Sequence, residues 1–379
     1  MVINETDREA DGSLQILRVA RAIYPESVGG GAIHVHSMSK RQAELGHEVT
    51  ILTTDHGDRS LPRTERRDGY TIKRHRELTN IFGNSIAPEF VRSLRRHSDE
   101  YDIVHAHSHL SFLSNVAAVL SRVGKLPLVL TNHGFRSQTA PDWIQQLYLP
   151  TVGRFTFNSA DMVLCYSNVE RDKLREEGVQ SPISVIHNGI DCSKFSPRPV
   201  NEKLQLLFVG RLRETKGPQM LMDLFERLAP EFPELKLKLV GDGPLYDTLR
   251  QRTMNSQFSD RISLVGEVTN DALPEIYTES SLLVLPTSRE GVPRTILEAM
   301  ACETPVVTTN LPQVIPVIDD GGRTVSRDLE TFETAVRSLL DDTEQRQKIG
   351  QLARQHVLEN YSWDETVRET TAKYFELVE

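Results

Sequence analysis

Two glutamates, Glu290 and Glu298, stand eight positions apart just after a short apolar run at 282–285. The run predicts a buried strand, and the proline that follows Gly291 and Val292 suits the first turn of a helix, where its missing N–H would have no partner. A strand, a glycine-containing turn and a helix N-terminus together favour an anion such as phosphate. The two carboxylates would flank that phosphate.

The spacing of these glutamates argues against hydrolysis. With a rise of about 1.5 Å per helical residue and a more extended start, Glu290 and Glu298 stand roughly 10 Å apart along the element. Carboxylates that hydrolyse a glycosidic bond stand about 5–9.5 Å apart and face each other. Two anchors for a long polar ligand fit better. The alternative is a loop glutamate and an exposed helix glutamate, but Glu298 interrupts the otherwise apolar run 296–301.

Two other loops suit phosphate groups. After an expected strand at 14–20, Gly30 and Gly31 open a helix, and glycines there let the backbone approach a ligand. The pattern is not G-x-G-x-x-G, which argues against a dehydrogenase. After a second strand come Arg211 and Lys216, a guanidinium and an ammonium that suit a diphosphate.

Histidines supply the remaining candidates. His133 ends an expected strand and could hydrogen-bond a sugar hydroxyl or a phosphate. His105, His107 and His109 alternate at strand spacing and would face one side if the strand continued, but a metal site there would need a carboxylate partner. Asp-x-Asp, the acidic pair that usually chelates the Mg²⁺ of a sugar nucleotide, does not occur. We therefore predict no metal site and no required cofactor.

Short apolar runs alternate with amphipathic helical segments, which predicts βαβ units and parallel sheets. The expected strands are 14–20, 48–53, 103–107, 126–130 and 162–165, then 204–209, 235–240, 262–265, 282–285 and 305–308. Two prolines at 195–199 suit a linker. We expect two doubly wound domains, 14–196 and 200–360, with ligands at the carboxyl ends of their strands and an active site in the cleft between them.

Composition sets further bounds. A length of 379 residues suits two domains, and 38% hydrophobic with 26% charged residues describes a soluble globular protein. Three scattered cysteines indicate neither a disulfide framework nor a zinc site. The start, 1–13, predicts a disordered polar tail rather than a signal peptide, and no apolar run is long enough for a transmembrane helix. We expect a cytoplasmic protein.

The net charge of −9 is unevenly placed. Residues 1–190 hold 22 basic and 22 acidic side chains, so the remainder carries the whole excess of acid. Within the first half, 59–96 has ten basic side chains against four acidic ones. This stretch is either a solvated face or a binding patch for anionic lipid headgroups or a phosphorylated acceptor. Binding to lipid headgroups would place the protein peripherally at the inner face of the membrane. An acidic chain without aromatic interleaving does not indicate nucleic acid as a partner.

Seven motifs, in order, resemble a retaining glycosyltransferase of family 4 with the GT-B fold, two Rossmann-like doubly wound domains facing across a cleft. The motifs are Gly29-Gly30-Gly31, Gly46-His47-Glu48-Val49-Thr50, Asp102-Ile103-Val104-His105-Ala106-His107, Val185-Ile186-His187-Asn188-Gly189-Ile190-Asp191, Gly210-Arg211 with Lys216-Gly217, Val240-Gly241-Asp242-Gly243-Pro244, and Glu290 through Glu298. The ending, 361–379, resembles the helix that packs back on the first domain.

The resemblance implies roles for these residues. Glu290 would hold hydroxyls of the donor sugar and Glu298 the ribose, while Arg211 and Lys216 would stabilise the departing diphosphate. On the first domain, His133 would support the transferred sugar, and Gly30 and Gly31 would approach the diphosphate. The implied activity moves a hexose from a UDP- or GDP-sugar to a glycan or lipid-linked acceptor, with retention by same-face or double-displacement chemistry.

Two departures from the family pattern concern the donor sugar. Glu303 stands where the family often has glycine, and 309–313 replaces a Gly-Gly-x-Pro-Glu pattern. Both positions are expected near the donor sugar or diphosphate, so the sugar is left open. Two alternatives also stay open, a nucleotide-sugar 2-epimerase on the same fold and a catalytically silent nucleotide-sugar-binding subunit. The presence of all four acidic and basic site residues, Glu290, Glu298, Arg211 and Lys216, argues against the catalytically silent subunit.

Overall fold

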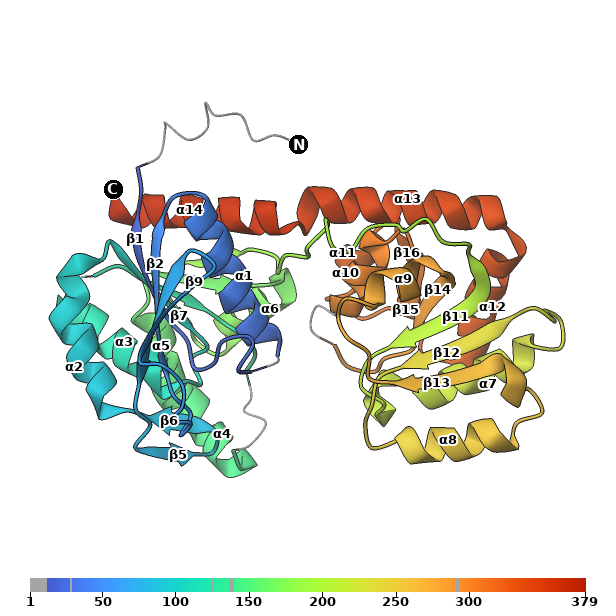
Figure 1. Ribbon diagram of the computed structural model, residues 1–379, viewed down its shortest axis with the longest axis horizontal. Helices are drawn as coiled ribbons and strands as arrows, with labels where there is room; N and C mark the ends of the chain where they lie inside the picture. Colours follow the sequence, from blue (N-terminus) through green and yellow to red (C-terminus); the bar gives the residue numbers. More distant parts are fainter. Residues whose placement is uncertain (1–11, 28, 125, 136–139, 291–293) are drawn as a thin grey trace. The chain divides into compact units, whose positions relative to one another are not determined.

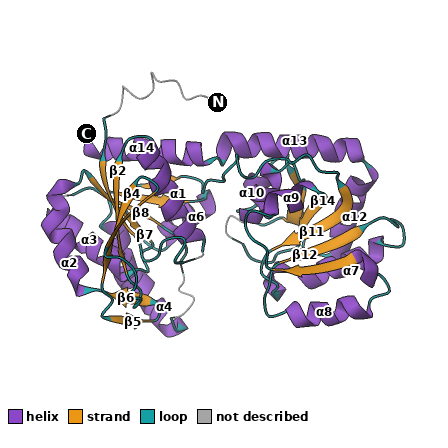
Figure 2. Ribbon diagram, viewed as in Figure 1, coloured by secondary structure: helices purple, strands orange, loops and turns teal. Residues whose placement is uncertain are grey.

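The computed structural model describes residues 12–27, 29–124, 126–135, 140–290 and 294–379. They form two compact units: unit 1 comprises Met1–Asn188 with Thr366–Glu379, and unit 2 comprises Gly189–Glu365. Each unit is built on a sheet flanked by helices (Figure 2). The tail expected at 1–13 lies outside the described residues as far as residue 11.

Unit 1 contains an eight-stranded sheet in the order β10-β9-β8-β7-β1-β2-β4-β3. Its strands are β1 (Gln15–Val19), β2 (Glu48–Thr54), β3 (Thr64–Arg67), β4 (Tyr70–His75), β7 (Ile103–His107), β8 (Leu128–Thr131), β9 (Met162–Cys165) and β10 (Ile183–Val185). All pairs are parallel except β3 with β4. Val19 pairs with Leu52 on one side and Ala106 on the other, so the carboxyl ends of these parallel strands lie at the same edge of the sheet.

Helices cover both faces of this sheet. They are α1 (Gly30–Glu44), α2 (Pro88–His97), α3 (Phe112–Gly124), α4 (Asp142–Tyr148), α5 (Arg154–Asn158), α6 (Asn168–Glu176) and the part of α14 (Trp363–Val378) from residue 366 on. In Figure 1, α2 and α3 lie on one side of the sheet and α1 and α6 on the other. A small antiparallel hairpin, β5 (Thr79–Ile81) with β6 (Asn84–Ile86), precedes α2.

Unit 2 contains a six-stranded, wholly parallel sheet in the order β13-β12-β11-β14-β15-β16. Its strands are β11 (Lys203–Val209), β12 (Lys236–Val240), β13 (Ile262–Gly266), β14 (Ser280–Leu285), β15 (Val306–Thr309) and β16 (Gly322–Val325). Its helices are α7 (Pro218–Leu228), α8 (Tyr246–Asn255), α9 (Leu273–Thr278), α10 (Arg294–Ala301), α11 (Ile315–Ile318), α12 (Leu329–Asp341) and α13 (Thr343–Asn360).

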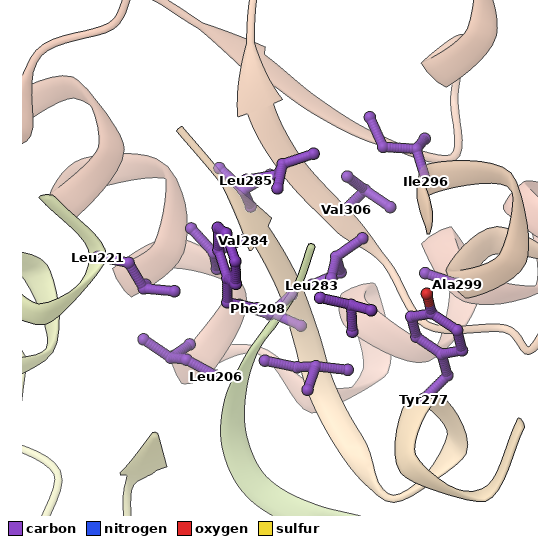
Figure 3. Close-up of a cluster of buried hydrophobic side chains, with 14 of the residues drawn as sticks. Leu206, Phe208, Leu221, Tyr277, Leu283, Val284, Leu285, Ile296, Ala299 and Val306 are labelled. Atoms are coloured by element: carbon purple, nitrogen blue, oxygen red, sulfur yellow. The ribbon is translucent and has the colours of Figure 1, made fainter. Parts of the chain in front are cut away.

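The strands of unit 2 contain apolar runs in the sequence because they lie in the core of the unit. All six residues of β14 are buried, because helices cover both faces of a parallel sheet. Figure 3 shows Leu283 and Val284 of this strand among side chains from β11, α7 and α10. Tyr277 of α9 lies in the same cluster, with its hydroxyl oxygen beside α10.

All ten expected strands are present, with their ends shifted by at most two residues. The break between the units lies earlier than the linker expected at 195–199. The physical reason is that Ile190 and Phe195 are buried in the core of unit 2, and the Ile190 N–H donates to Tyr361 O at 2.7 Å. Throughout the described part of the chain, every helix is too short or too polar to span a bilayer.

Candidate active site

In unit 2, two loops at the carboxyl edge of the sheet are tied together. The loop after β11 carries Thr215, whose carbonyl accepts a hydrogen bond from the Ser288 N–H in the loop after β14, at 2.8 Å. Gly217 has a φ of 74°, and a Cβ there would lie 2.3 Å from the Pro286 carbonyl oxygen. Only glycine permits this close approach of the two loops.

This contact brings a predicted cation and a predicted anion together. The Lys216 ammonium donates to the Glu290 carboxylate, and their side chains are 22% and 9% exposed. Gln313, which follows β15, donates to the Glu290 carbonyl at 2.6 Å and fixes the loop from its other side. Arg211 lies in the same loop as Lys216 with an exposed side chain. The arrangement places positive charge and a carboxylate together at one sheet edge.

Glu298 is buried on α10, with only 5% of its surface exposed, which excludes the exposed-glutamate alternative. The Tyr277 hydroxyl donates to one carboxylate oxygen at 3.1 Å, and Arg294 Nε lies 3.7 Å from the other. Burial raises the pKa of Glu298, partly offset by Arg294 and by the Tyr277 hydrogen bond. The predicted Gly291 and Val292 lie outside the described residues.

Replacing Tyr277 by phenylalanine is expected to lower the free energy of unfolding by about 1–3 kcal/mol, because a buried carboxylate loses a hydrogen bond. A carboxyl group whose folded-state pKa is raised binds its proton more tightly in the folded than in the unfolded state. Its stability contribution therefore falls as pH rises from the unfolded to the folded pKa. Since the lost hydrogen bond favours the charged form, the substitution should cost more at about pH 7 than at about pH 5.

Urea unfolding of Tyr277→Phe and the parent protein at both pH values measures this difference. The same pair in a Glu298→Gln background is the matched control, since a neutral amide should remove the pH dependence. An equal loss at both pH values would show that the Tyr277 hydroxyl stabilises the unit independently of the charge on Glu298 and would contradict this prediction.

In unit 1, the glycine turn that begins α1 lies next to His133, although the two were predicted from separate parts of the sequence. Gly30 and Gly31 begin α1, and a Cβ on Gly31 would lie 3.7 Å from His133 Nδ1. His133 Nε2 lies 2.9 Å from His107 Nδ1, and His133 Nδ1 lies 3.0 Å from the Tyr166 hydroxyl. Burial lowers the pKa of His133 to about 4. The ring is therefore neutral at physiological pH and lies against the glycine turn.

The alternating histidines do not form one row. β7 ends at His107, and Ser108 has a φ of 69°, which breaks the alternation. His109 is buried elsewhere, with its ring centroid 4.5 Å from that of Phe157. Among the described residues, no group of three or more His, Cys, Asp or Glu side chains has an arrangement that could hold a metal ion.

Part of the basic stretch at 59–96 is neutralised within unit 1. Arg67 and Arg74 both donate to Glu26 at 2.6 Å, and the Arg74 side chain is 1% exposed. The Arg67 hydrogen bond lowers the pKa of Glu26 to about 2. These arginines hold the glycine-bearing loop after β1 rather than facing an external partner.

Two positions depart from the family pattern, Glu303 and the segment 309–313, and only the segment lies beside the candidate site. Gln313 contacts the Glu290 loop, as described above. Glu303 instead precedes β15, at the other end of the strand, where a Cβ on Gly350 of α13 would lie 2.2 Å from its carbonyl oxygen. Its φ of 61° is left-handed, a conformation that favours glycine and explains the family preference at this position. The expectation that Glu303 lies near the donor sugar is not supported.

Two family models together cover most of the chain. The model described as Glycosyltransferase Family 4 matches residues 28–194, and that described as Glycosyl transferases group 1 matches residues 190–356. A phosphatidylinositol N-acetylglucosaminyltransferase gpi3 subunit of Schizosaccharomyces pombe is 27% identical over 372 residues, 94% of this chain and 79% of that protein. A glycogen synthase of Mycobacterium tuberculosis is 27% identical over 394 residues, 96% and 94% of the two chains.

Similarity to solved structures supports the same fold. HepE from Anabaena, solved in complex with UDP, superposes with a TM-score of 0.75 at 18% identity, over 96% of this chain and 100% of that one. Both sheets of the present structure have the parallel, helix-flanked architecture of GT-B domains, which confirms the predicted fold class. The chain belongs to the family 4 glycosyltransferases of the GT-B fold.

Proposed function

We propose that the protein transfers a hexose from a UDP- or GDP-sugar to a glycan or lipid-linked acceptor, with retained anomeric configuration and without a metal ion. The observation that carries the proposal is the contact between Lys216 and Glu290 at the carboxyl edge of the unit 2 sheet. A cation suited to a diphosphate and a carboxylate suited to sugar hydroxyls are held together by loops that Thr215 and Gln313 fix.

Each unit has a proposed part in the reaction. In unit 2, Arg211 and Lys216 stabilise the charge that develops on the diphosphate, Glu290 binds the donor sugar, and Glu298 binds the ribose. The bond from the anomeric carbon to the diphosphate oxygen breaks, a bond to the acceptor oxygen forms, and the proton of the acceptor hydroxyl leaves with the diphosphate. In unit 1, His133 donates a hydrogen bond to a substrate oxygen beside the Gly30 and Gly31 backbone.

A donor panel tests this proposal. Purified protein is incubated with UDP-, GDP- and ADP-sugars in the presence of EDTA, and free nucleoside diphosphate and sugar epimers are measured. Because HepE was solved with UDP and the gpi3 subunit is named as an N-acetylglucosaminyltransferase, UDP-glucose and UDP-N-acetylglucosamine are the first donors to test. Slow diphosphate release from one donor is expected. Release only after Mg²⁺ is restored would refute metal independence, and epimer formation without diphosphate release would favour the 2-epimerase. An anomeric proton coupling of the product that shows inversion would refute retention.

Three features of unit 1 favour a lipid-linked acceptor over a free glycan. The β5–β6 hairpin exposes Leu78, Ile81 and Phe82 to 73%, 49% and 47%. Beside it, a pocket of about 240 Å³ is lined mainly by apolar side chains of the hairpin, the start of α3, and α4. Arginines are exposed on the helix that follows the hairpin. They are Arg92, Arg95 and Arg96.

The stretch 59–96 is therefore proposed to contact an anionic membrane surface peripherally, at the cytoplasmic face. Co-sedimentation with vesicles should increase with the fraction of anionic lipid and weaken with salt, since each basic side chain near such a surface contributes about 1 kcal/mol. A variant with all three α2 arginines changed to glutamate should lose most of this binding, while vesicles of neutral lipid provide the control. Binding that is insensitive to both lipid charge and salt would contradict electrostatic contact.

A further inference from the structure

Unit 1 has a buried arginine in the middle of its sheet. Arg18 on β1 is 0% exposed, and no carboxylate forms an ion pair with it within the described ranges. Its Nη1 lies 3.2 Å from His105 Nδ1 and 3.1 Å from His107 Nε2, and its Nη2 donates to Gln42 Oε1. A buried charge has a large desolvation cost that an apolar side chain would avoid, so this charge needs an explanation.

The guanidinium sets the direction of a chain of hydrogen bonds. It can only donate, so His107 Nε2 must accept, and the neutral His107 ring then carries its hydrogen on Nδ1. That hydrogen points at His133 Nε2, 2.9 Å away, which leaves the hydrogen of His133 on Nδ1. His133 Nδ1 in turn donates to the Tyr166 hydroxyl at 3.0 Å.

The reverse direction is excluded by the same geometry. A hydrogen on His133 Nε2 would require His107 Nδ1 to accept, and His107 Nε2–H would then meet the N–H groups of Arg18. Burial, together with the charges of His105 and Arg18, holds the pKa of His107 well below its ordinary value. Double protonation of either ring is therefore disfavoured at physiological pH.

Other elements hold Arg18 and His105 in place. His105 Nε2 donates to Thr131 Oγ1 at 2.6 Å, and the Tyr374 hydroxyl of α14 lies 2.5 Å from His105 Nδ1. Gln42 of α1 donates to Thr371 Oγ1 at 3.0 Å. A further titratable neighbour is His34 of α1, whose ring centroid lies 5.4 Å from that of His133. Side chains of α1, β7, β8 and α14 thus surround the guanidinium.

We infer that Arg18 is a positioning residue, which acts through His107 to fix His133 as the tautomer with its hydrogen on Nδ1, the nitrogen nearest Gly31. The single hydrogen of His133, which donates to the Tyr166 hydroxyl in this structure, would then donate to a sugar hydroxyl or phosphate oxygen that takes the place of that hydroxyl, and His133 cannot serve as a general base there. This inference rests on the proposed function, in which His133 contacts substrate.

Nitrogen-15 NMR of the histidine rings in the full-length protein tests the tautomers directly. Signals of His107 and His133 are assigned from their loss in His107→Asn and His133→Gln. In the parent protein, both rings should stay neutral with the hydrogen on Nδ1 between about pH 5.5 and 8. A hydrogen on Nε2 of His133 would overturn the inference, and this measurement needs no Arg18 variant that folds.

Variants extend the test to turnover. Arg18→Met should mix the tautomers of His133 and lower kcat about tenfold or more, with little change in KM for the donor, because a misplaced imidazole hydrogen can cost far more than that in other enzymes. Arg18→Lys, which also only donates, should restore part of the loss, and Arg21→Met, on the loop after β1, is the control. Unchanged tautomers in Arg18→Met would overturn the inference. Full turnover in His133→Gln would refute the proposed role of His133 while the parent spectra still decide that of Arg18.

Discussion

Replacing Glu290 by alanine is expected to lower kcat/KM for release of nucleoside diphosphate by about 10²- to 10³-fold. The Glu290 side chain is 9% exposed and accepts a hydrogen bond from Lys216, so water cannot readily replace the lost carboxylate. The substitution removes the carboxylate that is proposed to hold the donor sugar and that also pairs with the Lys216 ammonium. Because the sugar carries developing charge only in the transition state, we expect the loss mainly in kcat.

The chain offers a matched control for this substitution. Glu303→Ala removes the same group at the end of the strand away from the Glu290 loop, and its rate should stay within about twofold of the parent, since surface changes away from a site have small effects. Glu290→Gln separates charge from shape, because the amide can still bind hydroxyls but pairs poorly with Lys216. A rate for Glu290→Ala within tenfold of the parent would refute the proposed role of this carboxylate.

The sheets could be predicted from sequence because their strands are buried on both faces. Continuous apolar runs such as 282–285 and 103–107 mark such strands without any knowledge of their neighbours. β4 was missed because Lys73 and Arg74 interrupt it, and Arg74 is buried with ion pairs to Glu65 of the adjacent strand β3 and to Glu26, which lies 48 positions away in sequence. β16 was missed because it has four residues and begins with glycine.

Parts of the candidate site could be predicted where a charged residue interrupts an apolar run of the sequence. Glu298 stood out as a charge in an apolar run, and Arg18 within 14–20 gives the same signal, which was overlooked. Tyr277 and Gln313 gave no such signal. Each acts through a contact made by tertiary folding, 21 positions from Glu298 and 23 positions from Glu290 respectively, and nothing in the local sequence specifies that contact.

Replacing Lys216 by methionine is expected to lower kcat about 10²-fold, since methionine keeps most of the side-chain length while removing the charge proposed to stabilise the diphosphate. The substitution also leaves the Glu290 carboxylate, 9% exposed, without its cation. Arg213→Met is the matched control, because Arg213 is an exposed basic residue of the same loop and should retain nearly full activity.

The double variant Lys216→Met with Glu290→Ala decides whether the two residues act as one unit. Each single substitution leaves the other side chain with an uncompensated charge, so part of each loss is shared. The cost in the double variant should therefore be clearly smaller than the two single costs combined, as for other catalytic groups that act together. Measurement of kcat/KM for the parent, both singles and the double with one donor completes the cycle. Additive costs would mean that the contact is incidental and that cation and carboxylate hold the donor independently.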